Sequence, residues 1–271
     1  MSSNRGSIAA CVAAAAYSGL VPAAQWKLQP PVPRVAYEIS DLHLVMMGII
    51  VLIFVCVFSL MFYSIYAHRK SAGHKAGQFH DNTTVEIVWT VIPLLILIVM
   101  AWPATKVLLD MKDASRSDIT IKATGYQGKW GYDYLKGEGE GISFLAQLTT
   151  RRDRIYGEKP KGEHHLFEVD NPMVVPVNRK IRILATANDV IHAWWVPAFA
   201  VKLDAIPGIV RDTWFRSEKE GTYLGQCAEL CGRDHGYVPI VVEVVSAEKY
   251  SAWVAEQKRK IASAAADPNR K

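Results

Sequence analysis

The chain has 271 residues, of which 50% are hydrophobic, and its formal net charge is +5. This length accommodates one ordinary domain with additional segments. Charges of both signs are mixed along the chain, without the basic stripe that follows phosphates, so the composition argues against nucleic acid as a partner.

The first residues have the pattern of a secretory signal. Arg5 precedes the apolar stretch IAACVAAAAYSGLV, and the small residues of VPAA follow it. A basic start, an apolar core and a small-residue cleavage site predict a signal peptide over residues 1–24, cleaved after about Ala23 or Ala24. Cys11 lies inside the apolar stretch, which is too early for a lipoprotein cleavage box.

Two long apolar runs follow the signal. Neither LVMMGIIVLIFVCVFSLMFYSIYA (44–67) nor IVWTVIPLLILIVMAWPAT (87–105) contains Asp, Glu, Lys or Arg. A helix of about 20 apolar residues crosses the hydrocarbon core of a membrane, and Trp89 and Trp102 suit its interfaces. We expect a transmembrane hairpin over 25–110, with helices over about 42–67 and 85–109. The alternative, a pair of buried core helices, is disfavoured by their length.

The segment between the two runs, HRKSAGHKAGQFHDN, carries Arg69, Lys70 and Lys75. Short loops rich in Lys and Arg lie on the cytoplasmic side of membranes. The pattern therefore places this loop in the cytoplasm and both ends of the chain outside.

After Asp110 the hydrophobic period changes to that of short strands. These are ITIKAT, the alternating Trp130, Tyr132 and Tyr134, HLFEV, MVVPV, KIRILATA, TYLGQ and IVVEVV, with turn residues between them. Even spacing of short strands predicts an antiparallel sandwich or barrel over about 116–246. Within it, TTRRDRIYGEKPKGEHH (149–165) is expected to be a solvated loop.

The last part of the chain, 247–271, is predicted to be a short helix and tail. AEKYSAWVAEQKRKIASAAA has helical composition. Its apolar residues Tyr250, Trp253, Val254 and Ile261 share a partial face, which we expect to pack against the sandwich.

The stretch CAELCGRDHGYV (227–238) carries metal-ligand chemistry. Cys227, Cys231 and His235 are spaced four residues apart. A disulfide is the ordinary expectation in an oxidising compartment, but it would leave the histidine unexplained. Soft thiolates together with imidazole suit copper or zinc.

Two thiolates can bridge two copper ions if each ion also finds a histidine. His235 is one such histidine, and NDVIHAWWVPAF offers His192 in apolar surroundings that exclude water. Zinc held by two cysteines and two histidines is the alternative. The remaining histidines have no cysteine nearby in sequence and are expected to be solvated or interfacial: His43, His68, His74, His80, His164 and His165.

Taken together, HAWWVPAF, KLDAIPG and GTYLGQCAELCGRDHGYVPIVVEV, behind a hairpin containing TTVEIVWTVIP, resemble subunit II of a bacterial haem-copper cytochrome c oxidase. The resemblance extends from about Trp26 to Ser246. It implies that the hairpin packs on the catalytic subunit of a bacterial inner-membrane complex that also contains subunit III. It further implies that 111–246 form a periplasmic cupredoxin domain with a binuclear copper centre, CuA.

In the family this resemblance points to, CuA takes electrons from cytochrome c and passes them to haem in subunit I, where oxygen reduction is coupled to proton pumping. The resemblance makes Cys227 and Cys231 the bridging thiolates and His192 and His235 the terminal imidazoles. It gives Glu229 two roles, a backbone carbonyl ligand to copper and a carboxylate ligand to a magnesium ion shared with subunit I. A hard cation that prefers oxygen fits the second role.

Glu86 stands at the start of the second apolar run, where a carboxylate facing lipid would be costly. The resemblance places it at the cytoplasmic entrance of a proton-uptake channel. A helix N-terminal acid behind Thr83 or Thr84 as the cap is a compatible interpretation.

Three further acids, Asp133, Glu138 and Glu140, could form a docking face for a basic cytochrome c. Taken alone they are ordinary surface charges.

Two positions depart from the family pattern. Val238 stands where the family has an axial methionine, and valine has no lone pair to offer. Gly128, in QGKW, stands where the family has the tryptophan that receives the electron, and Trp130 matches the other tryptophan of that motif. We hypothesise a divergent or duplicated subunit whose CuA centre is slow or shifted in potential.

Two other functions compete with this interpretation. A structural subunit without redox metal would need none of the cysteines and histidines of the stretch. A copper-delivery protein would share C-x3-C and a distant histidine, but its thioredoxin-like alternation of helices and strands differs from the strands seen here.

Overall fold

The computed structural model describes residues 29–73, 77, 80–155, 157 and 165–265. The expected signal peptide over 1–24, Cys11, His74 and His164 lie outside the described residues.

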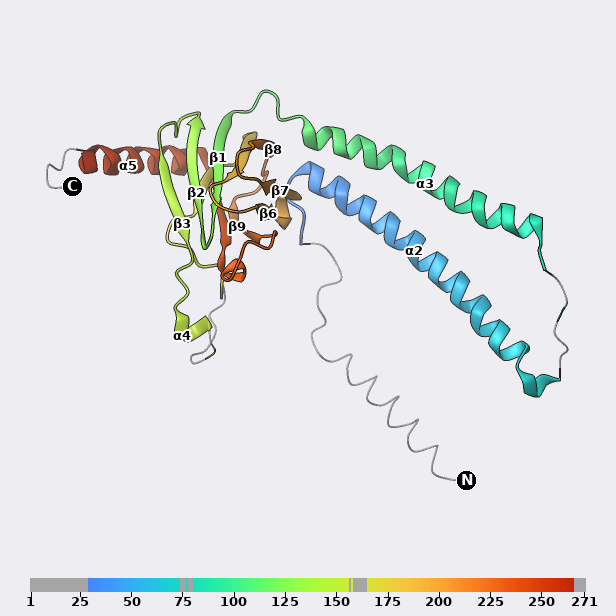
Figure 1. Cartoon of the computed structure of the whole chain (residues 1–271). Coiled ribbons are helices and arrows are strands. Elements are labelled where there is room, and N and C mark those ends of the chain that lie inside the picture. Colours follow the sequence, from blue (N-terminus) through green and yellow to red (C-terminus); the bar gives the residue numbers. More distant parts are fainter. Residues whose placement is uncertain (1–28, 74–76, 78–79, 156, 158–164, 266–271) are drawn as a thin grey trace. The chain divides into compact units, whose positions relative to one another are not determined.

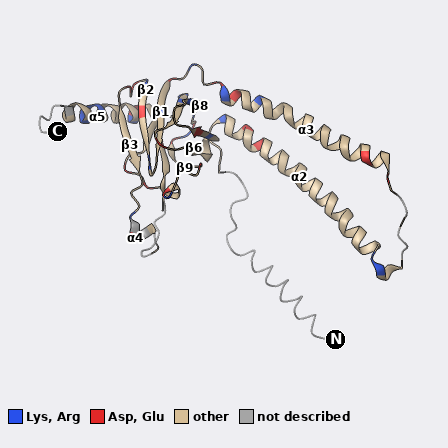
Figure 2. Cartoon of the chain, viewed as in Figure 1, with Lys and Arg blue, Asp and Glu red and all other residues tan. Residues whose placement is uncertain are grey.

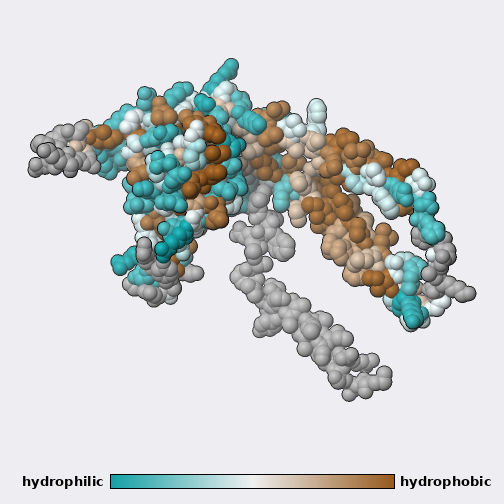
Figure 3. Space-filling model, viewed as in Figure 1, coloured by the Kyte–Doolittle hydropathy of each residue, from teal (hydrophilic) through white to brown (hydrophobic). Residues whose placement is uncertain are grey.

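Two long helices, α2 (Arg34–Ala67) and α3 (Thr83–Lys112), form the N-terminal part, with a short 3-10 helix (Lys70–Ala72) after α2. Each is long and apolar enough to cross a membrane. Figure 2 shows charged residues only near the helix ends, and Figure 3 shows apolar side chains over most of both helices. α2 begins before the expected position at about 42, since the chain is uninterrupted by Gly or Pro from Arg34 to Met47.

The N-terminus of α3 differs from the prediction. The cap is Asn82, whose Oδ1 accepts a hydrogen bond from the Val85 N–H at 3.2 Å, so the assignment to Thr83 or Thr84 was wrong. Asparagine is as good a cap as any residue, and it lies directly before the two threonines. Glu86 consequently lies in the first turn of α3.

The outer domain is all-β (Figure 1). Its strands are β1 (Ile119–Tyr126), β2 (Lys129–Lys136), β3 (Ser143–Gln147), β4 (Met173–Pro176), β5 (Ile181–Ala187), β6 (His192–Val196), β7 (Val201–Ala205), β8 (Arg211–Phe215), β9 (Gly221–Cys227) and β10 (Pro239–Val245). They form two five-stranded sheets, in the orders β3-β2-β1-β5-β8 and β4-β10-β9-β6-β7. This confirms the expected hairpin, cupredoxin-like sandwich and C-terminal helix.

Some details of the strand prediction were wrong. HLFEV forms turns, and its only ladder contact in the described part of the chain is a bridge from Val169 to Leu148. The sheets are also mixed, because β1 pairs with β5 and β4 with β10 in parallel. The segment 149–165 holds a one-turn helix, α4 (Arg152–Ile155), in the part that the structure describes.

The core fills the space between the sheets. Trp130, Tyr132 and Tyr134 alternate along β2 and are at most 1% exposed, which agrees with the period-2 pattern of the sequence. Trp194 of β6, on the facing sheet, stacks across the core on Phe215 of β8 at a centroid distance of 6.3 Å. Burying each such side chain stabilises the fold by roughly 1.5–3 kcal/mol, so this core is a rigid support for the loops at its end.

The C-terminal helix α5 (Ala247–Ala265) packs through Tyr250, Trp253 and Val254, and the Trp253 ring lies 5.4 Å from that of Tyr134. Ile261 is 44% exposed, so its inclusion in the packing face was wrong. The helix at this point extends past the sheet edge on which its first turns rest.

Candidate metal centre

The loop between β9 and β10 carries the cysteines, and backbone hydrogen bonds hold both of its ends. The Cys227 N–H donates to the Val238 carbonyl at 3.0 Å, which closes the base of the loop. The Ala228 N–H donates to the Ala193 carbonyl at 3.1 Å, which ties the loop to β6. Since β6 begins at His192, this tie brings a histidine from a distant part of the sequence beside the cysteines.

The donor atoms lie close together. The two Sγ atoms of Cys227 and Cys231 are 3.9 Å apart. His192 Nδ1 lies 3.7 Å from Cys227 Sγ, and His235 Nδ1 lies 3.5 Å from Cys231 Sγ. The Glu229 carbonyl oxygen lies 3.4 Å from Cys227 Sγ.

A disulfide would bring the sulfurs to about 2.05 Å, so the 3.9 Å separation is that of two free thiols. The donor atoms of His192, Cys227 and Cys231 all lie within 4.8 Å of one another, and all three side chains are buried. Two thiols, two imidazoles and a carbonyl oxygen suit copper, and two cysteines with two histidines also suit zinc. The residues present therefore fit a copper group, with zinc as the alternative.

Asp189 orients the buried histidine. His192 is fully buried, and its Nε2 lies 2.8 Å from Asp189 Oδ1. A carboxylate beside Nε2 keeps the proton there and leaves the Nδ1 lone pair facing Cys227, an arrangement common behind metal-bound histidines. Sequence reasoning missed Asp189, although an acid three residues before His192 was a usable signal.

Gln127 links this support to the loop. Its backbone N–H donates to Asp189 Oδ2 at 2.8 Å, and its Nε2 donates to the Cys231 carbonyl at 2.8 Å. Gln127, at the tip of the β1–β2 hairpin, thus contacts both halves of the cluster, through its backbone N–H on one side and its side chain on the other. Nothing in the sequence pattern pointed to Gln127.

The wall behind His192 is closely packed. The Trp130 ring lies edge-on to the imidazole at 5.9 Å and is fully buried. A Cβ on Gly125 would lie 2.7 Å from His192 Cδ2, closer than real Cβ contacts come. Glycine at this position lets β1 approach the imidazole, and any side chain would displace it.

The two cysteines differ in acidity. Burial opposes ionisation of Cys227, but hydrogen bonding to His192 and the backbone N–H of Ala193 hold the pKa of its thiol below the usual range. Burial and then the neighbouring Cys227 raise the pKa of the Cys231 thiol. For His192 burial works against protonation, yet Cys227 and Asp189 raise the pKa of the imidazole.

Val238 and Gly128, the two positions that depart from the family pattern, have different surroundings in the structure. Val238, which stands where the family pattern has methionine, is fully buried. Gly128 lies in the two-residue turn between the paired residues Tyr126 and Lys129, with a φ of +87°. That conformation favours glycine, so the turn itself disfavours a tryptophan at this position.

The structure brings His192, Cys227, Cys231 and His235 together, and leaves other expected residues elsewhere. Glu229 is exposed between the cysteines, and Glu86 lies in α3, outside the cluster. The described histidines outside the cluster are His43, His68, His80 and His165.

The three acids expected to form a docking face lie along β2 and just after it. Asp133 forms an ion pair with Lys122, Nζ to Oδ2 2.8 Å. Glu138 and Glu140 follow the end of β2, whereas Gly128 precedes its start. An eight-residue strand is roughly 26 Å long at 3.3 Å per residue, so Glu138 and Glu140 do not border the metal loop.

Comparison with known proteins gives two family matches that together cover most of the chain. The family described as "Cytochrome C oxidase subunit II, periplasmic domain" matches residues 119–245, and "Cytochrome C oxidase subunit II, transmembrane domain" matches residues 22–107.

Individual relatives agree with these matches. Cytochrome c oxidase subunit 2 of Cereibacter sphaeroides is 38% identical over 247 residues, covering 85% of this chain and 79% of the relative. The protein of the same name from Metridium senile is 39% identical over 230 residues, covering 85% of this chain and 89% of the relative. Among solved structures, the periplasmic domain of subunit II of cytochrome oxidase of Bradyrhizobium japonicum is 44% identical, with a TM-score of 0.48, covering 54% of this chain and 98% of that chain.

Proposed function

The chain belongs to the cytochrome c oxidase subunit II family, and from this premise we propose that its outer domain accepts electrons from a cytochrome c at a binuclear copper centre. The electrons then pass to haem in subunit I of the oxidase, where oxygen is reduced and protons are pumped. The two apolar helices and the family support an inner-membrane protein with two spans. We place the outer domain, 111–246, on the periplasmic side, with subunits I and III, cytochrome c and the lipid bilayer as partners.

One observation carries the proposal: two free thiols lie 3.9 Å apart, each with an imidazole nitrogen within 3.7 Å of its sulfur. Cys227, Cys231, His192, His235 and the Glu229 carbonyl would hold the copper pair. When bound, a copper pair of this kind supplies reversible one-electron transfer. Zinc would supply none, since it has no redox chemistry.

The chain's own residues keep the geometry fixed between redox states. Asp189 and Trp130 both contact the His192 ring and so restrict its orientation. Gln127 holds the Cys231 carbonyl in place. A site that is held in this way reorganises little when its charge changes, which favours rapid electron transfer.

Two acids receive further roles in the proposal. The exposed Glu229 carboxylate is free to bind a magnesium ion shared with subunit I, a role suited to a hard oxygen ligand. Glu86, in the first turn of α3, would admit protons from the cytoplasmic side. The Asn82 cap fixes the start of α3 and so the position of Glu86.

A second candidate is a structural subunit II whose CuA centre is impaired or absent. Val238 and Gly128 favour it, because the first removes the axial thioether and the second removes the tryptophan at the hairpin tip. The two candidates differ in whether the two thiolates and two imidazoles hold copper without an axial thioether.

The test is stopped-flow reduction of the copper-loaded oxidase by reduced cytochrome c. The proposal predicts bleaching of the thiolate-to-copper absorption before haem reduction, at a rate below that of a relative that has both the methionine and the tryptophan. Haem reduction without any copper-linked phase would support the structural subunit. A chain that delivers copper would instead transfer its metal to an acceptor protein.

A further inference from the structure

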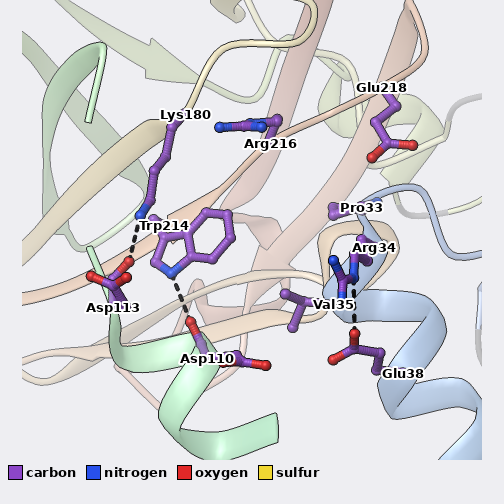
Figure 4. A pocket seen from close by; sticks show the side chains of 10 residues that line it. All are labelled: Pro33, Arg34, Val35, Glu38, Asp110, Asp113, Lys180, Trp214, Arg216 and Glu218. Atoms are coloured by element: carbon purple, nitrogen blue, oxygen red, sulfur yellow. Dashed lines mark hydrogen bonds and ion pairs between the residues drawn. The ribbon is translucent and has the colours of Figure 1, made fainter. Parts of the chain in front are cut away.

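A hollow of about 100 Å³ lies against two of the donor residues of the metal cluster. Its lining residues are Gln127, Gly128, Cys231, Arg233, Asp234 and His235. Arg233 and Asp234 are exposed, whereas Cys231 is buried, so the hollow connects the surface of the chain with the cluster. Figure 4 shows a larger cavity of about 370 Å³, but none of the residues that line it is a donor of the cluster.

The donor atoms form a series that leads inward from the hollow. Cys231 and His235 line the hollow, and the Cys231 Sγ lies 3.5 Å from the His235 Nδ1. Cys227 and His192 do not line it. The Cys227 Sγ lies 3.9 Å from the Cys231 Sγ, and the His192 Nδ1 lies 3.7 Å from the Cys227 Sγ. An ion that comes from the hollow therefore meets one thiol and one imidazole first and reaches the inner pair in two short steps.

The inner histidine has packed surroundings. His192 is fully buried, with the Trp130 ring edge-on to it at 5.9 Å and Asp189 at its Nε2. The β1 backbone approaches the same imidazole so closely at Gly125 that a Cβ there would lie 2.7 Å from it. These contacts occupy the sides of the ring that face away from Cys227, and they leave the hollow as the approach to the cluster.

Gly128 forms an open part of the lining. A Cβ on Gly128 would meet nothing within 4 Å, so a side chain there would extend into free space at the hairpin tip. Gln127 forms the wall beside it. The Gln127 Nε2 donates to the Cys231 carbonyl at 2.8 Å, and a Cβ on Gly232 would lie 2.6 Å from the same nitrogen. The hairpin tip thus touches the metal loop through Gln127 and leaves a gap at Gly128.

The hollow selects by size and not by charge. Arg233 and Asp234 give it one exposed charge of each sign, so neither cations nor anions are excluded. Because a water molecule takes about 30 Å³ of the liquid, a volume of about 100 Å³ holds a few water molecules or one small ion with part of its hydration shell. A protein side chain on a rigid partner would have little room to enter.

We propose that this hollow is the port through which copper reaches its buried ligands. The ion enters as Cu(I), the form that soft thiolates select, over Cys231 and His235, and it moves inward to Cys227 and His192. Each thiol that binds loses its proton to solvent, and no electron is transferred in this step. The inference rests on the proposed copper site and not on oxidation of cytochrome c, so a chain that took up copper without accepting electrons would refute the proposed function and leave the port intact.

The experiment compares G128W with G141W in the metal-free full chain in detergent. Both glycines lie in hairpin turns, at φ of +87° and +89°, and a Cβ on either would meet nothing within 4 Å. The two substitutions therefore impose similar backbone strain. Gly141 does not line the hollow, and it follows the end of β2, whereas Gly128 precedes its start.

Two rates are measured for each variant: alkylation of Cys231 by iodoacetamide, located by peptide mass spectrometry, and uptake of copper from a Cu(I)–chelator complex. G128W should slow both by roughly tenfold or more, because a filled hollow leaves only local opening of the loop as a route. G141W should match the unchanged chain in both rates. The final copper content should be the same in all three proteins, since no ligand has been removed.

Equal rates in G128W and G141W would overturn the proposal. A comparison of reagent sizes tests it without any substitution: a maleimide carried on a polyethylene glycol chain should leave Cys231 unmodified under conditions in which iodoacetamide modifies it. Modification by the bulky maleimide would show that the loop opens widely and that the hollow is not the route. If the unchanged chain took up no copper, the copper site itself would be refuted, and the alkylation rates, which need no metal, distinguish that result from loss of the port.

Discussion

Gly125 and Gly236 form a natural pair for testing how the metal centre is built. Each lies beside a histidine of the cluster, but they differ in the space around them. A Cβ on Gly125 would lie 2.7, 2.8 and 2.9 Å from three atoms of the His192 side chain, whereas a Cβ on Gly236 would meet nothing within 4 Å. Neither residue has a positive φ, so alanine is allowed by the backbone at both positions.

The loss of unfolding free energy expected for Gly125→Ala follows from these distances. Carbon atoms in contact prefer about 3.5–4.0 Å, so the His192 ring would have to move by roughly 1 Å. Trp130 and Asp189 block that movement on the other sides. Overpacking of this kind costs about 1–3 kcal/mol, while Gly236→Ala should stay within about 0.5 kcal/mol.

The assay combines urea unfolding of the metal-free fragment 115–271 with copper binding by the same fragment. G125A should lower the free energy of unfolding by the amount above and also lose copper affinity, because Nδ1 of His192 no longer faces Cys227. G236A should retain both properties. If G125A bound copper as tightly as G236A, the packing account of the His192 position would be refuted.

Three further predictions concern single residues. Asp189→Asn should weaken copper binding by roughly 10- to 100-fold, measured by competition with a chelator, and an unchanged affinity would show that the carboxylate does not support His192. Val238→Met should keep two coppers per chain and lower the reduction potential by stabilising the oxidised state; an unaltered potential in voltammetry would mean that the sulfur does not reach the metal. Burial opposes ionisation of Asp133, yet Lys122 and a serine hydroxyl hold the pKa of its carboxyl below the ordinary value of 3.8. The ionised carboxylate therefore stabilises the fold above pH 3.8, and this stabilisation disappears as the pH falls through the folded-state pKa. Asp133→Asn should therefore cost about 0.5 kcal/mol at pH 7 and nothing at the acid end of a pH series of unfolding curves, and a cost that grew toward acid would contradict this sign.

The parts of the fold that depend on local pattern were predictable from the sequence. The apolar runs predicted both long helices, and the alternation of Trp130, Tyr132 and Tyr134 predicted the buried face of β2. The spacing of Cys227, Cys231 and His235 was enough by itself to indicate a metal site. Each of these patterns is formed by residues close together in the sequence, so a single sequence is enough to detect it.

What the sequence did not indicate depends on contacts between distant segments. Gln127 supports the cluster through hydrogen bonds to residues 62 and 104 positions away. HLFEV looked like a strand because of its composition, but no neighbouring strand pairs along its length in the described part of the chain. The parallel pairing of β1 with β5 likewise follows from the arrangement of the whole sandwich.

The two departures from the family pattern have a physical meaning in the folded chain. Gly128 at a φ of +87° shows that the hairpin tip is built around glycine and does not simply lack a tryptophan. Val238 is fully buried, so a hydrocarbon side chain fills the position at which the family pattern has a methionine.

The central claim, that this chain holds a working copper pair without an axial thioether, is tested most directly by metal analysis and electron paramagnetic resonance of the copper-loaded protein. The account predicts two coppers per chain and a hyperfine pattern from one electron shared equally by both ions. A single copper with the hyperfine pattern of a localised electron, or no bound copper, would contradict it and would leave a subunit that keeps the fold of its family without the redox centre.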